Sequence, residues 1–146
     1  MKDFLYFAPA ERPELISPLA LAYLGDSVYD LYVRQYLLSK PSRRPNELHR
    51  EATRYVSAKA QARAVRLIDP ELTEEERGML YRGRNAKSHA APKNTDVQDY
   101  RYSTGFECLV GFLYLSGRHE RLEKLMRMTL GLEPAVQAEE DNNAHE

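Results

Sequence analysis

Apolar residues recur every three or four positions along most of the chain, the spacing of an α-helix that buries one face. The first such stretch opens with Ser17 and Pro18, a typical N-cap and first helical residue, and Pro41 stops it. Its periodic positions are Leu24, Val28, Leu31, Gln35 and Leu38. A second helix is expected from Asn46, with Leu48, Ala52 and Tyr55 on one face, and a third from Ser57 to Ile68.

The second half of the chain continues the helical pattern. Thr73 with Glu76 forms a capping box for a short helix that ends near Gly83, and Thr95 with Gln98 predicts another. The helix that follows has a core stripe of Phe106, Leu109, Val110, Leu113 and Tyr114, and the last helix, striped by Leu122, Leu125, Met126 and Leu130, ends at Gly131. We therefore predict an all-α domain over residues 1–132 and a disordered acidic tail over residues 133–146.

Composition restricts the environment and the partners. No stretch approaches the roughly 20 apolar residues of a membrane span, so we expect a cytoplasmic protein with no membrane contact. A lone Cys108 excludes an internal disulfide, and the four histidines lack the spacing of a zinc site. The net charge is −1, but the tail holds five acids, which leaves 21 basic and 17 acidic residues elsewhere. That excess favours a polyanionic partner without proving one.

The segment Leu24-Gly25-Asp26-Ser27-Val28 places a glycine and an acid in the middle of the first helix. Glycine costs a helix interior about 1 kcal/mol relative to alanine, and a carboxylate on a buried face must be paired or bound to metal. Asp26 is therefore a candidate functional acid. The alternative is that Asp26 faces solvent, while Gly25 only lets another helix pack closely.

Glu107 is the second candidate acid. It shares a helical stripe with three small residues that would let another helix approach: Ser103, Thr104 and Gly111. If the Gly25 face of the first helix packs on this stripe, Asp26 and Glu107 converge, and two convergent carboxylates attract Mg²⁺ through hard oxygen ligands. The alternative is that Glu107 caps a helix or pairs with Arg101 or another base.

Residues 82–102 are rich in cations and small polar side chains, and residues 84–94 have no apolar periodicity, so we predict a functional loop. Such side chains suit the phosphates and 2′-hydroxyls of double-stranded RNA. A solvated polar loop is the alternative. The candidate RNA-binding residues are Arg82, Arg84, Asn85, Lys87, Ser88, Lys93, Asn94, Thr95 and Arg101.

A second basic set repeats at helical spacing along the predicted second and third helices: Arg50, Arg54, Lys59, Arg63 and Arg66. Two interpretations stay open for it. Either this set extends a track for RNA, or it is an ordinary solvated face in which Glu47 and Glu51 pair with the bases.

Two segments together resemble the signature motifs of the ribonuclease III catalytic domain: Leu24-Gly25-Asp26-Ser27-Val28 and Phe106-Glu107-Cys108-Leu109-Val110-Gly111. The resemblance is closest to the Mini-ribonuclease III branch, which lacks a separate domain for binding double-stranded RNA, and it spans residues 17–130. The segments that carry this closer likeness are Tyr81-Arg82-Gly83-Arg84-Asn85-Ala86-Lys87-Ser88, Pro92-Lys93-Asn94-Thr95-Asp96-Val97-Gln98 and Val56-Ser57-Ala58-Lys59.

This resemblance implies a helical homodimer that hydrolyses double-stranded RNA with Mg²⁺, or with Mn²⁺ in its place, and that matures a precursor of large-subunit ribosomal RNA. It implies that Asp26 orients the metal and activates water and that Glu107 is the second metal ligand. Full-length members carry further acids where this chain has Leu19, Ala22 and Thr104, a departure that the Mini branch shares. Water, phosphate or backbone oxygens would then complete the Mg²⁺ shell.

Two other function classes compete with the nuclease. One is a noncatalytic RNA-binding module that keeps the fold and uses the two acids for structure. The other is a helical scaffold that binds another protein, against which the basic residues of 82–101 speak. Cleavage of duplex RNA separates the first from an enzyme, and salt-dependent RNA binding separates the second from both.

Overall fold

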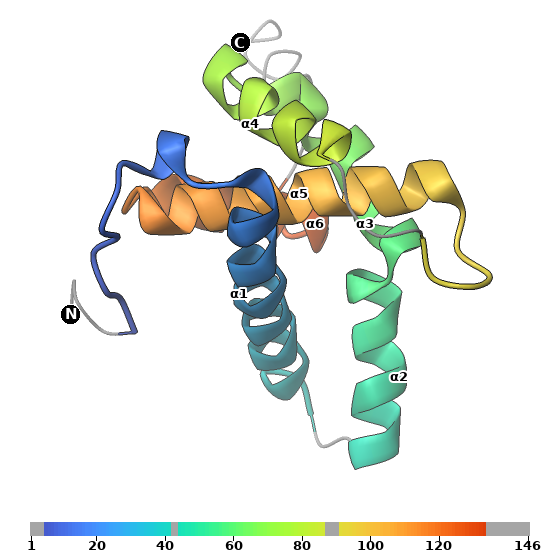
Figure 1. The fold of residues 1–146 in the computed structure, drawn as a ribbon. Coiled ribbons are helices and arrows are strands. Elements are labelled where there is room, and N and C mark those ends of the chain that lie inside the picture. The colour runs from blue at the N-terminus through green and yellow to red at the C-terminus, as the bar shows by residue number, and fades with distance from the viewer. Residues whose placement is uncertain (1–4, 42–43, 87–90, 134–146) are drawn as a thin grey trace, which may run out of the picture.

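The computed structural model describes residues 5–41, 44–86 and 91–133, and these residues form helices without a strand (Figure 1). The all-α prediction is confirmed. Residues 134–146 of the predicted tail lie outside the described residues. The helices are η1 (Pro13–Leu15), α1 (Pro18–Leu38), α2 (Pro45–Val56), α3 (Ala58–Ile68), η2 (Asp69–Glu71), α4 (Glu74–Asn85), α5 (Val97–Leu115) and α6 (His119–Thr129).

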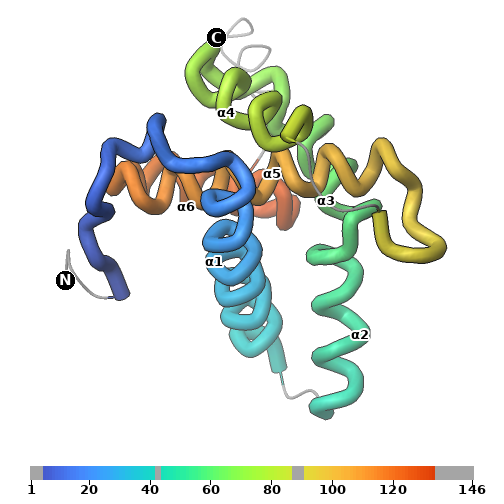
Figure 2. Tube along the Cα trace, in the orientation of Figure 1, coloured from blue at the N-terminus to red at the C-terminus, as the bar shows by residue number. Residues whose placement is uncertain are grey.

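Helix α5 is the centre of the fold. Helices α1, α3 and α4 pack directly on it, α6 contacts both α3 and α5, and α2 leads from the end of α1 back to α3 (Figures 1 and 2). The core stripe predicted for α5 is confirmed, since Phe106, Leu109, Val110 and Leu113 are buried. Phe106 also packs edge-on against Tyr29 of α1, with ring centroids 4.8 Å apart.

Helix α1 buries a different face from the one its spacing suggested. The buried positions are Leu21, Ala22, Gly25, Tyr29, Val33 and Leu37, whereas Leu31, Gln35 and Leu38 are exposed. Apolar residues occur all round this helix, so their spacing alone does not select the face that meets the core. The face centred on Gly25 turns inward because backbone contact with α5 is possible only there.

Glycines let α5 meet α1 and α4 at backbone distance. A Cβ atom at Gly25 would lie 1.8 Å from the carbonyl oxygen of Glu107, and one at Gly111 would lie 2.0 Å from the carbonyl oxygen of Leu21. Between α4 and α5, a Cβ at Gly83 would lie 2.9 Å from the Cα of Gly105. The predicted docking of the Gly25 face on the small-residue stripe of α5 is confirmed.

The helix starts agree with the sequence predictions in part. The capping box of α4 is confirmed, because Thr73 Oγ1 accepts from the Glu76 amide (3.1 Å) and Glu76 Oε1 accepts from the Thr73 amide (2.9 Å). The capping box predicted from Thr95 is wrong: α5 begins one residue later, where Asp96 Oδ1 accepts from the Asp99 amide (3.0 Å). Aspartate is a stronger N-cap than threonine, and the two are neighbours.

A buried ion-pair network ties the beginning of α4 to α6. Arg121 donates to both carboxylate oxygens of Glu76, each at 2.8 Å, and to Glu71 Oε1 at 3.0 Å. Burial by itself would raise the pKa of Glu76, but hydrogen bonds from Arg121 and Thr73 outweigh it and lower that pKa. The charge on Glu76 is therefore held at neutral pH, and α4 is fixed at its first turn.

Two composition-based predictions concern the described residues. Cys108 is fully buried and free, and burial raises the pKa of its thiol to about 11, so the thiol stays protonated at neutral pH. No helix in the described part of the chain is long and apolar enough to cross a membrane.

We expect opposite effects on stability from two glycine-to-alanine substitutions. Gly111→Ala should destabilise the protein by about 1–3 kcal/mol or more, because the added Cβ would overlap the Leu21 carbonyl, which cannot rotate away. Gly78→Ala should stabilise it by about 0.5–1 kcal/mol, since Gly78 is exposed inside α4 and a Cβ there meets nothing within 4 Å. Urea denaturation of both variants measures the difference. Equal stabilities would contradict the close α1–α5 contact.

Candidate active site

The crossing of α1 and α5 brings the two candidate carboxylates together. Gly25 and Gly111 have no side chains that would hold the two helices apart. The side chains of Asp26 and Glu107, which lie beside this crossing, therefore meet at its edge. Their side chains are close enough to hydrogen-bond each other. The predicted convergence of the two acids is confirmed, and no ion pair forms between Glu107 and the exposed Arg101 within the described structure.

The two carboxyl groups differ in environment. Asp26 is exposed on the outer side of α1, whereas Glu107 is half-buried. Burial is the main cause that raises the pKa of Glu107 to about 8, and the neighbouring charge and hydrogen bond of Asp26 add to it. Without a cation, Glu107 therefore keeps its proton near neutral pH. A perturbed carboxyl beside a second carboxyl is typical of a functional site.

Gln61 of α3 is a site residue that the sequence analysis missed. Its side chain is 2% exposed, and with its amide oriented to suit its neighbours the nitrogen donates to Glu107 Oε1 (3.2 Å) and to the Ser103 carbonyl (3.2 Å). This hydrogen bond fixes the direction of the Glu107 carboxyl group. The sequence feature that could have indicated Gln61 is its position as the one amide side chain in the alanine-rich stretch of residues 58–64, on the inward face of that helix.

The oxygen atoms present fit one hard divalent cation held mainly by two carboxylates. Glu107 resists ionisation through burial and through Asp26, and a cation between the two groups would remove both penalties. Among the described residues, no group of three or more acids, histidines or cysteines is placed to hold a metal ion. The positions without acids hold a half-buried Leu19, a buried Ala22 and a Thr104 whose hydroxyl donates to the Tyr100 carbonyl (3.1 Å). Mg²⁺ accepts this sparse set because it commonly keeps several waters.

The loop predicted over residues 84–94 lies between α4 and α5, and its bounds are displaced by two residues because α4 continues to Asn85 and α5 begins at Val97. Arg82, Arg84 and Asn85 lie in the last turn of α4, and Arg101 lies on α5, so only residues 86–96 connect the two helices. Lys87 and Ser88 lie outside the described residues.

Two of the predicted RNA-binding arginines already have partners within the protein. The Arg84 guanidinium lies over the ring of Tyr81 (4.4 Å to its centroid) and donates to the Tyr102 hydroxyl (3.1 Å). Arg82 donates to the Glu14 carbonyl (2.9 Å). By contrast, Lys93 and Arg101 are exposed and pair with no acid among the described residues. Asn94 adopts a left-handed backbone (φ 67°), and Thr95 follows it.

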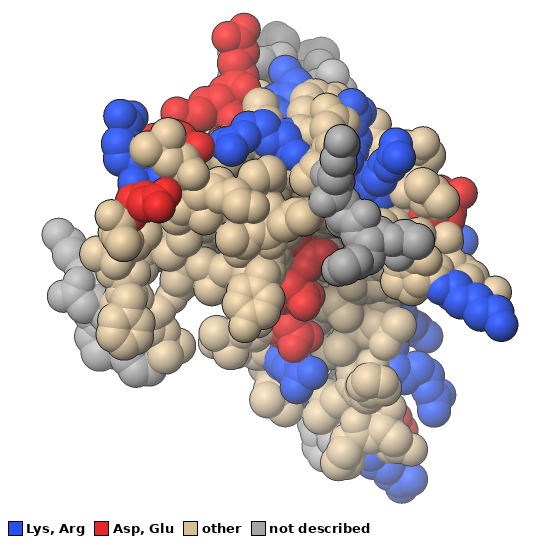
Figure 3. Space-filling model, viewed as in Figure 1, with Lys and Arg blue, Asp and Glu red and all other residues tan. Residues whose placement is uncertain are grey.

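The second basic set is exposed along α2 and α3. None of its five members forms an ion pair with a described acid: Arg50, Arg54, Lys59, Arg63 and Arg66. The carboxylate of Glu47, an expected partner, accepts from the Arg44 amide instead (3.3 Å). Figure 3 shows the result on one face: an acidic group beside α1, with Lys and Arg side chains over α4 and along α2.

Comparison with known proteins agrees with this geometry. The chain is 55% identical over 113 residues to the Mini-ribonuclease 3 of Enterococcus faecalis, covering 76% of this chain and 86% of the relative. It is 51% identical over 116 residues to that of Symbiobacterium thermophilum, covering 80% and 89%. A crystal structure of a Fusobacterium nucleatum protein superposes with a TM-score of 0.75 at 27% identity, covering 84% of this chain and 98% of that one.

The match also extends to the family as a whole. The profile of the Ribonuclease III domain covers residues 19–118, which include α1 to α5, both carboxylates and Gln61. The matched regions cover most of the length of these two relatives. On these grounds, the chain belongs to the ribonuclease III family of endoribonucleases.

Proposed function

We propose that this protein hydrolyses phosphodiester bonds in double-stranded RNA with Mg²⁺, or with Mn²⁺ in its place, and that its natural substrate is a precursor of large-subunit ribosomal RNA. The observation that carries this proposal is the Asp26–Glu107 pair at the α1–α5 crossing of a ribonuclease III family chain. Two convergent carboxylates of this kind suit metal-assisted hydrolysis.

The chain's own residues divide the work according to their exposure. Asp26 is exposed and faces an incoming phosphate, so it orients the attacking water. Glu107 is half-buried and accepts a hydrogen bond from Gln61, so its carboxyl group has little conformational freedom. When bound by these two carboxylates, Mg²⁺ lowers the pKa of a bound water and offsets charge on the phosphate. Gln61 is a positioning residue in this scheme, since it acts through Glu107.

Asp26→Asn and Glu107→Gln should each lower the rate of duplex-RNA cleavage by at least about a hundredfold, because both remove charge that holds the metal while keeping size and shape. Affinity for duplex RNA should change little. The measurement is single-turnover cleavage of a long duplex with Mg²⁺, with single-stranded RNA and duplex DNA as controls. Normal cleavage by a folded Asp26→Asn protein would favour a noncatalytic RNA-binding module.

The same variants have a pH signature in thermal melts without metal. Since the pKa of Glu107 is raised to about 8, the unfolded chain releases this proton at lower pH than the folded one, and stability falls as pH rises from about 4.5 to 8. Glu107→Gln lacks this loss, so its melting temperature should exceed that of the wild type by more at pH 8 than at pH 5. Mg²⁺ should stabilise only the wild type. A variant that melts lower at every pH would indicate a structural role.

We also propose that the end of α4 and the beginning of α5 grip the RNA backbone. Lys93 and Arg101 supply the charge that the protein does not already use, and Arg82 and Arg84 set the shape of the surface beside them. Proteins bind duplex RNA mainly through two kinds of side chain, positively charged ones and small polar ones. The contact proposed for Lys87 is of the first kind, and those proposed for Asn85, Ser88, Asn94 and Thr95 are of the second kind.

Replacing Lys93 and Arg101 with alanine should weaken duplex affinity and make it less dependent on salt. Each lost phosphate contact should lower the slope of log affinity against log salt by somewhat less than one unit. Binding titrations over a salt series measure this. Arg118→Ala is the matched control, because Arg118 is an exposed cation at the other end of α5 that pairs with Glu75. An equal loss in the control would contradict the assignment.

A homodimer is the form in which such a site can cut both strands. The outward face of α1 presents large apolar side chains, with Tyr23 84%, Leu31 48% and Leu38 70% exposed, beside the Arg34–Asp30 ion pair. It continues into an apolar groove between α1 and α2 lined by Leu37, Leu38, Leu48 and Ala52 among others. A two-fold axis at this face would place two Asp26 side chains toward strands of opposite polarity.

Tyr23→Glu should convert the dimer to a monomer, because it places a charge in the middle of the proposed interface. Sedimentation at micromolar concentration measures the mass, and duplex cleavage should fall with it. Leu67→Glu, an equally drastic change at an exposed leucine of α3, is the control and should stay dimeric. A wild-type monomer that cuts duplex RNA would refute the proposed dimer.

A further inference from the structure

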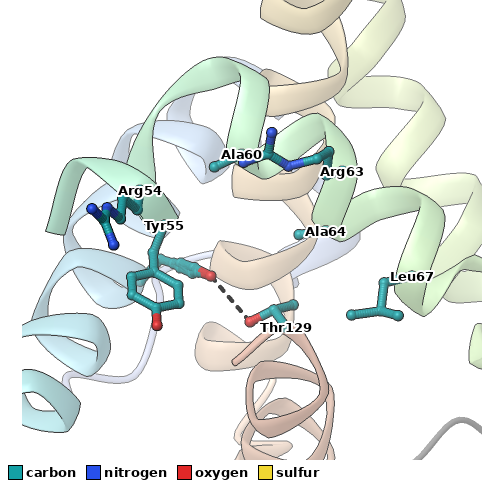
Figure 4. Close-up of a pocket in the computed structure, with 8 residues that line it drawn as sticks. Arg54, Tyr55, Ala60, Arg63, Ala64, Leu67 and Thr129 are labelled. Atoms are coloured by element: carbon teal, nitrogen blue, oxygen red, sulfur yellow. Dashed lines mark hydrogen bonds between the residues drawn. The ribbon is translucent and has the colours of Figure 1, made fainter. Parts of the chain in front are cut away.

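A second cavity lies away from the α1–α5 crossing. It holds about 240 Å³ between α2, α3 and the C-terminal end of α6 (Figure 4). It is slightly smaller than the roughly 300–1,000 Å³ of pockets for drug-sized ligands, so a ligand of that size would fill it and reach its rim. Its lining residues are Tyr29, Arg54, Tyr55, Ala60, Arg63, Ala64, Leu67 and Thr129.

The base of this cavity is already satisfied. The hydroxyl of Tyr29 is hydrogen-bonded to Thr129 Oγ1 (3.0 Å), as the dashed line in Figure 4 shows. Burial raises the pKa of Tyr29 to about 12, so its hydroxyl is neutral at physiological pH. The small side chains of Ala60 and Ala64 leave the space above this base open. The base contributes shape rather than charge.

The rim of the cavity carries uncompensated positive charge. Arg54 on α2 and Arg63 on α3 are both exposed, and neither forms an ion pair with a described acid. No carboxylate belongs to the lining. Guanidinium groups bind phosphate through paired hydrogen bonds, and two of them beside one cavity favour a ligand with more than one negative charge.

The remaining walls suit a flat ring. Tyr55 is half-buried, and its ring is held edge-on against Tyr36 with centroids 6.1 Å apart. Leu67 lies along α3 on the same side as Arg63 (Figure 4). An aromatic wall next to guanidinium groups is the combination that accepts a nucleobase and its phosphate.

We propose that this cavity is a binding site for a phosphate monoester carried on a nucleoside, with the phosphate between Arg54 and Arg63 and the ring against Tyr55. The site is separate from the carboxylate pair: Ala60 and Gln61 are adjacent on α3, but they point about 100° apart around the helix. The ligand is either a free nucleotide or the 5′-phosphorylated end of an RNA strand, which offer the same chemistry.

Calorimetric titration of the full chain in EDTA at fixed ionic strength tests the site. Adenosine 5′-monophosphate should bind, inorganic phosphate should bind more weakly, and adenosine should give no signal. Arg54→Gln and Arg63→Gln should each weaken nucleotide binding at least tenfold. Arg50→Gln and Arg66→Gln are matched controls on the same two helices and should stay within twofold of the wild type. Melts confirm that all four variants fold, since every changed residue is exposed.

Three results would overturn the proposal: no binding of the nucleotide at millimolar concentration, equal binding of adenosine, or an equal loss in all four variants. The source of the ligand is decided with short single strands of RNA. Phosphate-dependent binding of a 5′-phosphorylated strand assigns the site to RNA ends, and its absence assigns the site to free nucleotides. Duplex RNA with 5′-hydroxyl ends is the last test. If it binds through Arg54 and Arg63 as tightly as the 5′-phosphorylated strand does, these residues contact the RNA backbone and the monoester site is refuted.

Discussion

The backbone contact between α1 and α5 is the constraint on which the rest of the structure depends. Gly25 and Gly111 each face a carbonyl of the opposite helix at a distance that no side chain tolerates. With the helices this close, Asp26 and Glu107 share one edge, and Gln61 reaches Glu107 from α3. A wider crossing would leave two unrelated carboxyl groups, one in water and one in the core.

This arrangement carries a cost that a purely structural pair would avoid. Glu107 is half-buried beside another acid, so its ionised form is disfavoured when no cation is present. By contrast, Glu76 and Glu71 in the described part of the chain both accept hydrogen bonds from Arg121. Among the described residues, Glu107 has only the Gln61 amide and a second acid beside it, which is the arrangement expected under the proposed metal-binding role.

Much of this fold is predictable from local signals, and the failures have physical reasons. Three features were predicted correctly: the capping box at Thr73, the buried stripe of α5 and the glycine contact between α1 and α5. Each depends on the residue pattern of only one or two helices. The buried face of α1 was not predicted, since apolar residues surround that helix. The contact of Gln61 with Glu107 and the hydrogen bond from Arg84 to Tyr102 depend on packing between different helices, which periodicity does not report. The dimer and the RNA contacts stay predictions.

The second glycine contact, between Gly83 and Gly105, determines how firmly α4 is held in place. It fixes the last turn of α4 against α5 at a point two residues before Glu107, while Arg121 fixes the first turn of α4 to α6. A helix fixed at both ends cannot slide, so any surface displayed at its tip keeps a constant separation from the carboxylates. Helix α4 therefore holds its last turn at a fixed distance from Asp26 and Glu107.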